Sequence, residues 1–479
     1  MKKEQIIEEI KNRIKEIQWF RQAAAIKPLY LLIPAVGAGR GISSTTITSV
    51  KGMNCEFFVP KKIMIKQAET ALEANIENTN MIDRYMKDFY AANEQLDNFF
   101  KKIDLEKNLF NQLNEFNKIL LDVWSKNWLC DKFDPEGNEM LAKEIGQIKL
   151  NSEEIFTLTF PQKLNYIDEE ELELNQIALS VYDEKLTDEE LIEELKQHAQ
   201  KFFYINNSWY NVEVLQAKDF LDGLKKLLSY DQKLLIKRVD EINNKINSLK
   251  DKCNQIVKDK NISPNLNNTF YLFRRLAESR DVRKMFTLKT NHYWDVFAKA
   301  FAKRYSYNYN EIVKASPYEL NEENLSSKEY MDELKRRKDH TFFYITDKNI
   351  FVYSDKQAEK LTNLIQNNFL EEFEELKGRC ASKGKVIGTV KVVMNEVHFS
   401  KFNEGDILVA PMTRPEYILL MKKASAIITD EGGLTCHATI ISRELGIPCI
   451  IGTQVASKKL IDGMEVEVDA DNSIIKVIK

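Results

Sequence analysis

The residues with the clearest potential for chemistry lie in one segment near the C-terminus, Thr429–Thr453. Its sequence is TDEGGLTCHATIISRELGIPCIIGT, in which Gly432 and Gly433 precede His437 and a helix-like run follows it. Glycines permit a tight turn and let a ligand approach the backbone. The free amides at the start of the following helix, with the helix dipole, favour an anion beside this histidine.

A neutral imidazole is a good nucleophile near pH 7, so the pattern predicts that His437 accepts a phosphoryl group and passes it on. The Thr435 hydroxyl, two residues earlier, is expected to donate a hydrogen bond to phosphoryl oxygen. The residue pattern alone leaves one alternative open, because a single histidine after a glycine turn is often a purely structural residue.

The elements around His437 are expected to form a compact α/β domain. We predict strands at Lys385–Met394, Gly405–Ala410, Ala424–Thr429 and Cys449–Gly452, helices at Pro415–Lys423 and Ala438–Leu445, and a closing hairpin of Met464–Val468 with Ser473–Val477. Gly446 and Pro448 are suited to end the second helix.

The composition changes near residue 375, because glycine is scarce before it and frequent after it. The predicted fold is therefore multidomain, with a large, mainly α-helical N-terminal region at 1–370 and an α/β domain at 371–479. Further division of the first region near residues 60 and 265 is left open. The acidic segment 366–376 is expected to be a helical hinge between the two.

The N-terminal region carries separate apolar helix faces without a sustained heptad, which favours a packed bundle. Helices are expected at about 6–17, 67–129, 187 onward, 212–260 and 272–305, with a capping box of Thr187 and Glu190. A strand pair at 341–346 and 349–353 is predicted to turn at 347–348.

Several motifs in the last hundred residues match a known pattern. They are KGRCASKGKVIGTVKVV at 377–393, APMTRPEY at 410–417, ASAIITDEGG at 424–433, TCHA around His437 and SRELGIPCIIGT at 442–453. Together they resemble the mobile phosphohistidine domain of the PEP-utilising enzymes, which include phosphoenolpyruvate synthase, pyruvate phosphate dikinase and rifampicin phosphotransferase. The resemblance covers roughly residues 375–479.

This resemblance implies that the α/β domain swivels and that His437 is the phosphorylated residue. It implies that Gly432, Gly433 and Thr435 shape the loop and that Thr413 and Arg414 help to hold phosphate. It also makes Cys436 a packing residue rather than a redox site. Thr439 and Ser442 stand where alanine is usual in the family.

The remainder of the family's machinery is not recognised in the sequence. There is no Walker A pattern, no ATP-grasp domain and no strand–helix alternation long enough for a barrel. The layout is similar to the helical and histidine domains of rifampicin phosphotransferase. By that weaker likeness, Glu278, Arg280, Arg283 and Lys284 are possible contacts of an acceptor, with a solvated charged helix face as the equal alternative.

The bulk properties exclude several other functions. The net charge of −4 provides no basic field for nucleic acid and no polybasic membrane patch. The six cysteines form no CxxC pair, so no metal site is predicted, and free thiols suit the cytoplasm. The N-terminus does not resemble a signal peptide. The remaining histidines are interpreted as structural or surface residues: His198, His292, His340 and His398.

The leading hypothesis is a phosphotransferase component. His437 would carry phosphoryl to a small-molecule acceptor bound by the helical region. The chain itself is expected to bind no cofactor, whereas Mg and ATP or phosphoenolpyruvate would act at a donor site on a separate ATP-grasp protein resembling phosphoenolpyruvate synthase. The alternatives are a non-catalytic binding or regulatory protein, and a full dikinase-like enzyme with an unrecognised nucleotide site within 28–210. The glycine-rich loop at 37–46 is favoured as a plain loop over a phosphate cradle.

Overall fold

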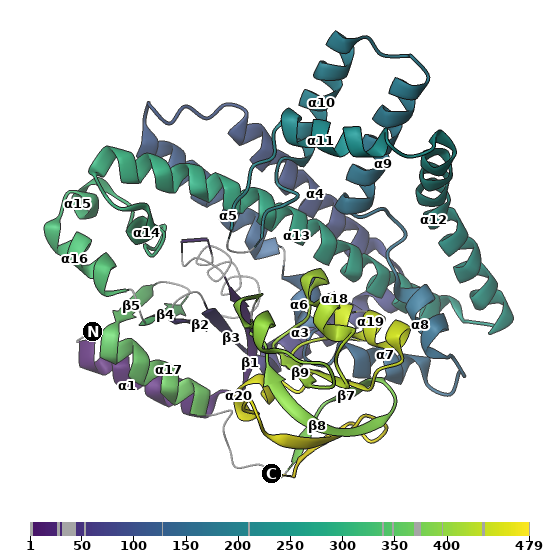
Figure 1. The fold of residues 1–479 in the computed structure, drawn as a ribbon. Coiled ribbons are helices and arrows are strands. Elements are labelled where there is room, and N and C mark those ends of the chain that lie inside the picture. The colour runs from purple at the N-terminus through teal and green to yellow at the C-terminus, as the bar shows by residue number, and fades with distance from the viewer. Residues whose placement is uncertain are drawn as a thin grey trace.

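The structure is a computed structural model that describes residues 3–25, 29–30, 45–51, 54–126, 128–208, 211–337, 340–346, 349–367, 375–394, 396–433 and 436–478. Figure 1 shows a largely helical region and a C-terminal sheet region packed beside it. This arrangement confirms the predicted combination of a mainly helical N-terminal region and an α/β C-terminal region, whereas the domain boundaries stay predictions.

A five-stranded antiparallel sheet lies within the helical region, with strand order β1-β3-β2-β4-β5. Its strands are β1 (Trp19–Ala25), β2 (Thr45–Lys51), β3 (Asn54–Pro60), β4 (His340–Thr346) and β5 (Ile350–Ser354). The predicted strand pair at 341–353 is confirmed, with the residues of its turn outside the described part of the chain. We did not predict β1–β3. Thr45 and Thr46 of the glycine-rich loop belong to β2, and residues 37–44 lie outside the described residues.

Two helices cover one face of this sheet, α1 (Lys3–Glu16) and α17 (Asp355–Asn367) (Figure 1). Ile6, Ile10 and Ile14 recur every four residues along α1 and are buried against Phe58 and Phe342 of the sheet. The helix predicted at about residues 6–17 is therefore confirmed as α1.

The helical region is organised around α13 (Pro264–Tyr305), a helix of 42 residues. Ser263 caps its start by accepting a hydrogen bond from the Leu266 amide, and Pro264 occupies its first turn. The helices before it are α3 (Lys61–Ile76), α4 (Asn80–Phe100), α5 (Leu109–Lys126), α6 (Leu129–Lys132), α7 (Gly137–Ile145) and α8 (Ser152–Thr159). Aromatic side chains of α4, α5 and α13 fill the core between these helices.

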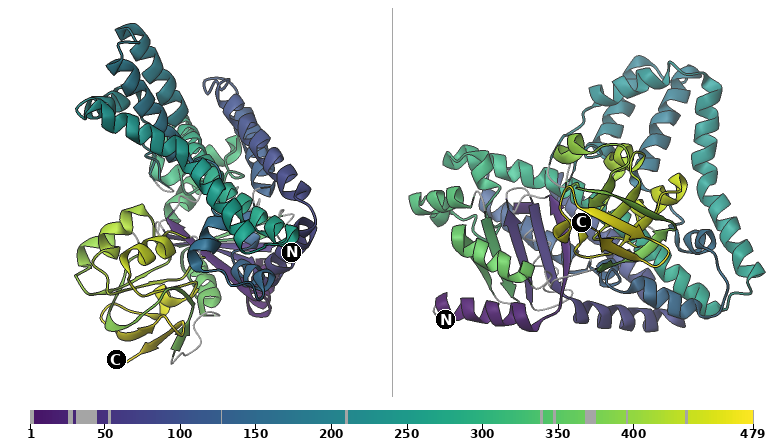
Figure 2. Two further views of the ribbon diagram at one scale, coloured as in Figure 1. Left: turned by 90° about the vertical axis from the view of Figure 1, so that its right-hand side faces the viewer. Right: turned by 60° about the horizontal axis from the view of Figure 1, so that its bottom comes forward.

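Four further helices project away from the five-stranded sheet (Figure 1 and Figure 2). They are α9 (Tyr166–Tyr182), α10 (Asp188–Phe202), α11 (Ala217–Leu227) and α12 (Gln232–Asp259). The predicted capping box is present at the start of α10, where the Glu190 amide donates to the Thr187 hydroxyl and the Thr187 amide donates to the Glu190 carboxylate.

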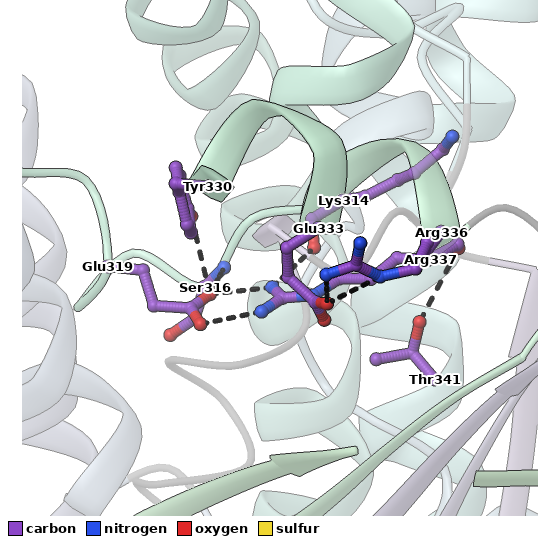
Figure 3. Close-up of polar contacts among 8 residues, drawn as sticks. All are labelled: Lys314, Ser316, Glu319, Tyr330, Glu333, Arg336, Arg337 and Thr341. Carbon is purple, nitrogen blue, oxygen red and sulfur yellow. Dashed lines mark hydrogen bonds and ion pairs between the residues drawn. The ribbon is translucent and has the colours of Figure 1, made fainter. Parts of the chain in front are cut away.

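Three short helices follow α13: α14 (Tyr309–Ile312), α15 (Glu322–Leu325) and α16 (Lys328–Arg336). Figure 3 shows the ion pair that ties them together. The buried Arg337 guanidinium donates to both oxygens of Glu319, each at 2.7 Å, and the Ser316 amide donates to the same carboxylate. The turn at residues 317–320, which contains Glu319, thus has a structural role in fixing these helices.

The C-terminal region is built on an eight-stranded sheet with order β6-β13-β12-β8-β9-β10-β11-β7. The strands are β6 (Glu375–Lys377), β7 (Arg379–Ser382), β8 (Lys385–Val392), β9 (Ile407–Ala410), β10 (Ala426–Thr429), β11 (Cys449–Ile451), β12 (Glu465–Asp469) and β13 (Ile474–Val477). β8 through β11 are parallel neighbours, and the outer pairs are antiparallel. The helical segments are η1 (Glu396–Lys401), η2 (Pro415–Tyr417), α18 (Ile418–Met421), α19 (His437–Leu445) and α20 (Ala456–Lys459).

The predicted strands and helices of this region are confirmed to within a few residues. The expected helical hinge at 366–376 is wrong at its end, because residues 375–377 form β6, which pairs with β13. Residues 368–374 lie outside the described part of the chain.

Candidate active site

His437 is the first residue of α19, at the carboxyl end of the parallel strands. β10 ends at Thr429, and the loop that follows turns at Gly432, whose φ is +135°. A Cβ atom at Gly432 would lie 2.8 Å from the Cys436 sulfur, so this position requires glycine. The loop is tied to the helix because the Thr439 hydroxyl donates to the Gly433 carbonyl at 2.9 Å. Thr439, which departs from the usual alanine, therefore stabilises the loop.

The two ring nitrogens of His437 have different surroundings. Nδ1 lies 3.0 Å from the Thr413 hydroxyl, on the loop between β9 and η2. Nε2 is buried and has no hydrogen-bond partner among the residues that the structure describes. When Nδ1–H donates to Thr413, the lone pair of Nε2 is free for nucleophilic attack.

The start of α19 has no side-chain cap. Cys436 precedes the helix with extended backbone angles, and its side chain makes no capping hydrogen bond. The first amides of a helix lack intrahelical partners and carry the positive end of the dipole. An anionic group on His437 would therefore meet favourable backbone dipoles.

Charged residues from two regions surround the histidine. Burial lowers the pKa of His437; the carboxylate of Glu416 opposes this shift, and the ammonium group of Lys284 adds to it. Glu416 belongs to η2, whereas Lys284 belongs to α13 of the helical region. The ring therefore stays neutral, and nucleophilic, around neutral pH.

Lys284 and its neighbours form the helical side of the site. Burial lowers the pKa of Lys284, while Glu416 and Asp281 oppose this shift. Burial raises the pKa of Asp281 to about 6, although Lys284 and Arg280 oppose it. Asp281 and Lys284 are three residues apart and so share one face of α13. A cation thus stands within electrostatic range of His437, and a carboxyl group with a pKa near neutrality lies beside that cation on α13.

Comparison with known proteins identifies the C-terminal sheet. Residues 402–473 match the family model described as "PEP-utilising enzyme, mobile domain". The C-terminal region carries a mobile domain of the PEP-utilising enzymes. The recognition of this domain from the motifs around His437 is therefore confirmed.

The relatives share this mobile domain and little else. A probable phosphoenolpyruvate synthase of Archaeoglobus fulgidus is 56% identical over 100 residues, which are 21% of this chain and 13% of that protein. A phosphoenolpyruvate synthase of Pyrococcus furiosus is 47% identical over 25% of this chain and 15% of its own length. An uncharacterized phosphotransferase of Bacillus subtilis, YvkC, is 39% identical over 26% of this chain and 15% of its own length. The matches thus span less than a sixth of these three relatives.

The structure brings together most of the predicted residues of the mobile domain. Thr413 contacts the His437 ring, and Arg414 follows it on the same loop, within electrostatic range of Lys284. Gly432 forms the turn. Gly433 lies against Asn138 of α7, since a Cβ atom there would be 3.4 Å from the Asn138 amide nitrogen. Thr435 lies outside the described residues.

Three of the four residues predicted as possible acceptor contacts on α13 form hydrogen bonds or ion pairs inside the helical region. Glu278 accepts from the Tyr90 hydroxyl at 2.6 Å and pairs with Arg275. The other two, Arg280 and Arg283, form ion pairs with Asp134 and Asp131 of the α6–α7 segment. A carboxylate or guanidinium that is already paired has few groups left for a ligand. Of the predicted cluster, only Lys284 belongs to the group around His437, and the sequence prediction missed Asp281 beside it.

The remaining candidates have structural surroundings. His198 is buried between Glu173 and Glu170, and His398 accepts a hydrogen bond from the Met394 amide. The Cys436 sulfur lies 3.4 Å from the Thr439 hydroxyl and packs in the loop. Within the described residues, no three His, Cys, Asp or Glu side chains are grouped to hold a metal, and no helix is long and apolar enough to cross a membrane.

Proposed function

We propose that this chain is a phosphotransferase component in which His437 is transiently phosphorylated. The mobile domain takes phosphoryl from an ATP or phosphoenolpyruvate site and delivers it to a small-molecule acceptor at the helical region. The observation that carries this proposal is the arrangement of the ring, with Nδ1 at 3.0 Å from the Thr413 hydroxyl and Nε2 without a hydrogen-bond partner among the described residues.

The first step is attack of Nε2 on phosphorus. The nitrogen lone pair forms an N–P bond while the P–O bond to the donor breaks, and the donor oxygen keeps that electron pair. In this step the Thr413 hydroxyl accepts the hydrogen bond from Nδ1–H, which leaves the lone pair on Nε2. The uncapped start of α19 stabilises the negative charge of the phosphoryl oxygens.

The second step occurs with His437 facing α13. An acceptor oxygen attacks phosphorus, the N–P bond breaks, and its electron pair returns to Nε2. Lys284 offsets the charge of the transferring group, and Asp281 takes the proton that the acceptor oxygen loses, since burial raises its pKa to about 6. This assignment favours an acceptor with a hydroxyl group or another ionisable oxygen.

The donor site lies on a separate ATP-grasp protein in this proposal, with Mg bound there. One histidine cannot face donor and acceptor at the same time when they lie on different bodies, so the domain that bears it must move between them. The relatives named phosphoenolpyruvate synthase align with this chain over 100 and 126 residues. We therefore assign the donor site to a partner because the chemistry requires one, and not because these alignments indicate it.

Radiolabelling of the full chain tests the proposal. The chain is incubated with labelled ATP or labelled phosphoenolpyruvate, alone and with candidate ATP-grasp partners. We expect an acid-labile label on the wild-type chain and its complete loss in His437→Asn. His398→Asn, in the same domain, is the matched control and should keep the label. Absence of label with every donor and partner, or a label independent of His437, would overturn the proposal.

The His437→Asn variant and a measurement of ATP binding separate the two alternatives. A binding or regulatory protein would keep its function in the His437→Asn variant. A complete enzyme with its own nucleotide site would bind ATP without a partner, which calorimetry on the isolated chain detects.

A further inference from the structure

One short segment of the helical region meets the mobile domain at two points. Arg379 of β7 donates to the Pro135 carbonyl at 3.0 Å and forms an ion pair of 2.7 Å with Glu139 of α7. Gly433, in the loop before His437, lies against Asn138 of the same helix. In Figure 1, α7 accordingly lies beside β7 and α19. We call residues 131–139 the docking segment.

The docking segment is fixed to α13 by two ion pairs, of which Arg283–Asp131 is the more buried. Arg283 pairs with Asp131, whose side chain is only 2% exposed, and Arg280 pairs with Asp134. Arg280 also donates to the Cys130 carbonyl at 3.2 Å. The helix that presents Lys284 therefore also holds the surface on which the mobile domain rests. This gives Arg280 and Arg283 a role different from acceptor binding.

The contact made by Arg379 is more exposed to water than the Arg283–Asp131 pair. The Arg379 side chain is 26% exposed and that of Glu139 is 54% exposed. Partly exposed ion pairs are weak and are screened by salt, whereas a hydrogen bond from a guanidinium to a carbonyl adds directional preference. Such a contact can select one position of a domain and still release it.

Docking has a consequence for His437. In the docked position Nε2 is buried, and the charge of Lys284 reaches the ring from the helical region. A donor on another protein needs in-line access to Nε2. The mobile domain must leave the docking segment before His437 can be loaded.

We propose that Arg379, with Glu139 and the Pro135 carbonyl, is a releasable latch that holds the mobile domain in its delivery position. The latch rests on the proposed function for its role in transfer. The contact itself is independent of phosphoryl chemistry, so its test remains informative even if no label is ever found on His437.

Chemical modification of His437 measures the latch directly. Diethyl pyrocarbonate transfers an ethoxycarbonyl group to a neutral imidazole nitrogen, and mass spectrometry of the peptides reports the rate at each histidine. Burial lowers the pKa of His437, so the ring is in its neutral, reactive form at pH 7. The reaction rate therefore depends on how easily the reagent reaches the ring. His398, which lies in the same domain, is the internal reference for folding and reagent concentration.

Charge reversal should open the latch. We expect Arg379→Glu and Glu139→Arg each to raise the rate at His437, relative to His398, by roughly twofold to fivefold, which corresponds to the strength of a partly exposed ion pair. The double variant restores attraction between residues 379 and 139 and should recover part of the protection. In the wild-type chain, 1 M NaCl should raise the rate in the same direction.

Lys377→Glu is the matched control, because Lys377 is an exposed residue that pairs with Glu375 on β6, two positions before Arg379. It should leave the rate at His437 unchanged. The latch is overturned if the two single variants react like the wild-type chain, or if the double variant is as reactive as the singles.

Discussion

The two sides of the site are held in place by different physics. His437 stands on a loop whose shape depends on near neighbours, namely the turn at Gly432 and the hydrogen bond from Thr439 to Gly433. Lys284 stands on a long helix whose position depends on buried ion pairs with distant residues, such as Arg283 with Asp131. The first side carries its geometry within one small domain, whereas the second is assembled from several helices.

In the proposed function the histidine moves while its surroundings keep their shape, and this difference allows both. A loop fixed by local contacts keeps its shape when the whole domain moves. A surface fixed by buried pairs does not move, because separating a buried charge from its partner costs several kcal/mol. We therefore expect His437 to move with its domain and the helical side of the site to stay in place.

Breaking the fixed side should have the largest effect. Arg283→Ala leaves the carboxylate of Asp131 buried without its partner. We expect a loss of about 3–5 kcal/mol in the free energy of unfolding, measured by urea denaturation. The double variant Arg283→Met/Asp131→Asn removes both charges and should be less destabilised than the single variant.

Arg414 provides the matched control on the mobile side. It is half-buried and its side chain has no hydrogen bond or ion pair within the described residues. Arg414→Ala should change the free energy of unfolding by less than about 1 kcal/mol. Equal losses for Arg283→Ala and Arg414→Ala would show that the two sides are not held differently.

The same contrast decides what the sequence could reveal. The strands and helices of the mobile domain were predictable because glycine turns, β-branched runs and helix ends follow one another closely between Ala424 and Gly452. In the N-terminal region, β2 pairs with β4 from the opposite end of the helical region. β2 and β3 pair with each other as a hairpin across two residues, a local pattern that the prediction overlooked, whereas no local pattern encodes the pairing of β2 with β4.

The faces of α13 posed a similar problem. Arg280 and Arg283 share one face of the helix, and Asp281 and Lys284 share the next. Which face is internal depends on Asp131 and Asp134, and the Arg283–Asp131 pair spans 152 residues. The sequence therefore identified a charged helix, but not which of its charges were already paired. The spacing of Asp131 and Asp134, which equals that of the two arginines, was the available signal.

The buried carboxyl group of Asp281 on α13 should make the free energy of unfolding depend on pH. Burial raises its pKa to about 6 in the folded chain, above the ordinary value of 3.8. A raised carboxyl pKa contributes stability that is fully present below pH 4 and is lost as the pH rises through 6. Asp281→Asn should therefore match the wild-type chain at pH 4 and exceed its free energy of unfolding at pH 7.5 by on the order of 2 kcal/mol.

Urea denaturation at the two pH values measures this difference, and the pH 4 data serve as the internal control for packing changes caused by the amide. A difference between Asp281→Asn and the wild-type chain that is the same at both pH values would contradict the assignment. It would mean that Asp281 ionises in the folded chain as it does in the unfolded chain.

The smallest expected effect is the most direct test of how the two sides meet. The Lys284 ammonium lowers the pKa of His437, and the Glu416 carboxylate raises it. Lys284→Met should therefore raise the titration midpoint of His437, and Glu416→Gln should lower it, each by less than about one unit. Titration of the His437 ring by NMR with labelled histidine measures both shifts.

The two residues differ in which side they belong to. Glu416 belongs to the same domain as His437 and moves with it in the proposed function, whereas Lys284 belongs to α13. In an Arg379→Glu background, where the latch is weakened, the effect of Lys284→Met should shrink while that of Glu416→Gln persists. If both effects survive unchanged in that background, the histidine does not leave the helical region when Arg379 is lost, and the contrast between a travelling side and a fixed side fails.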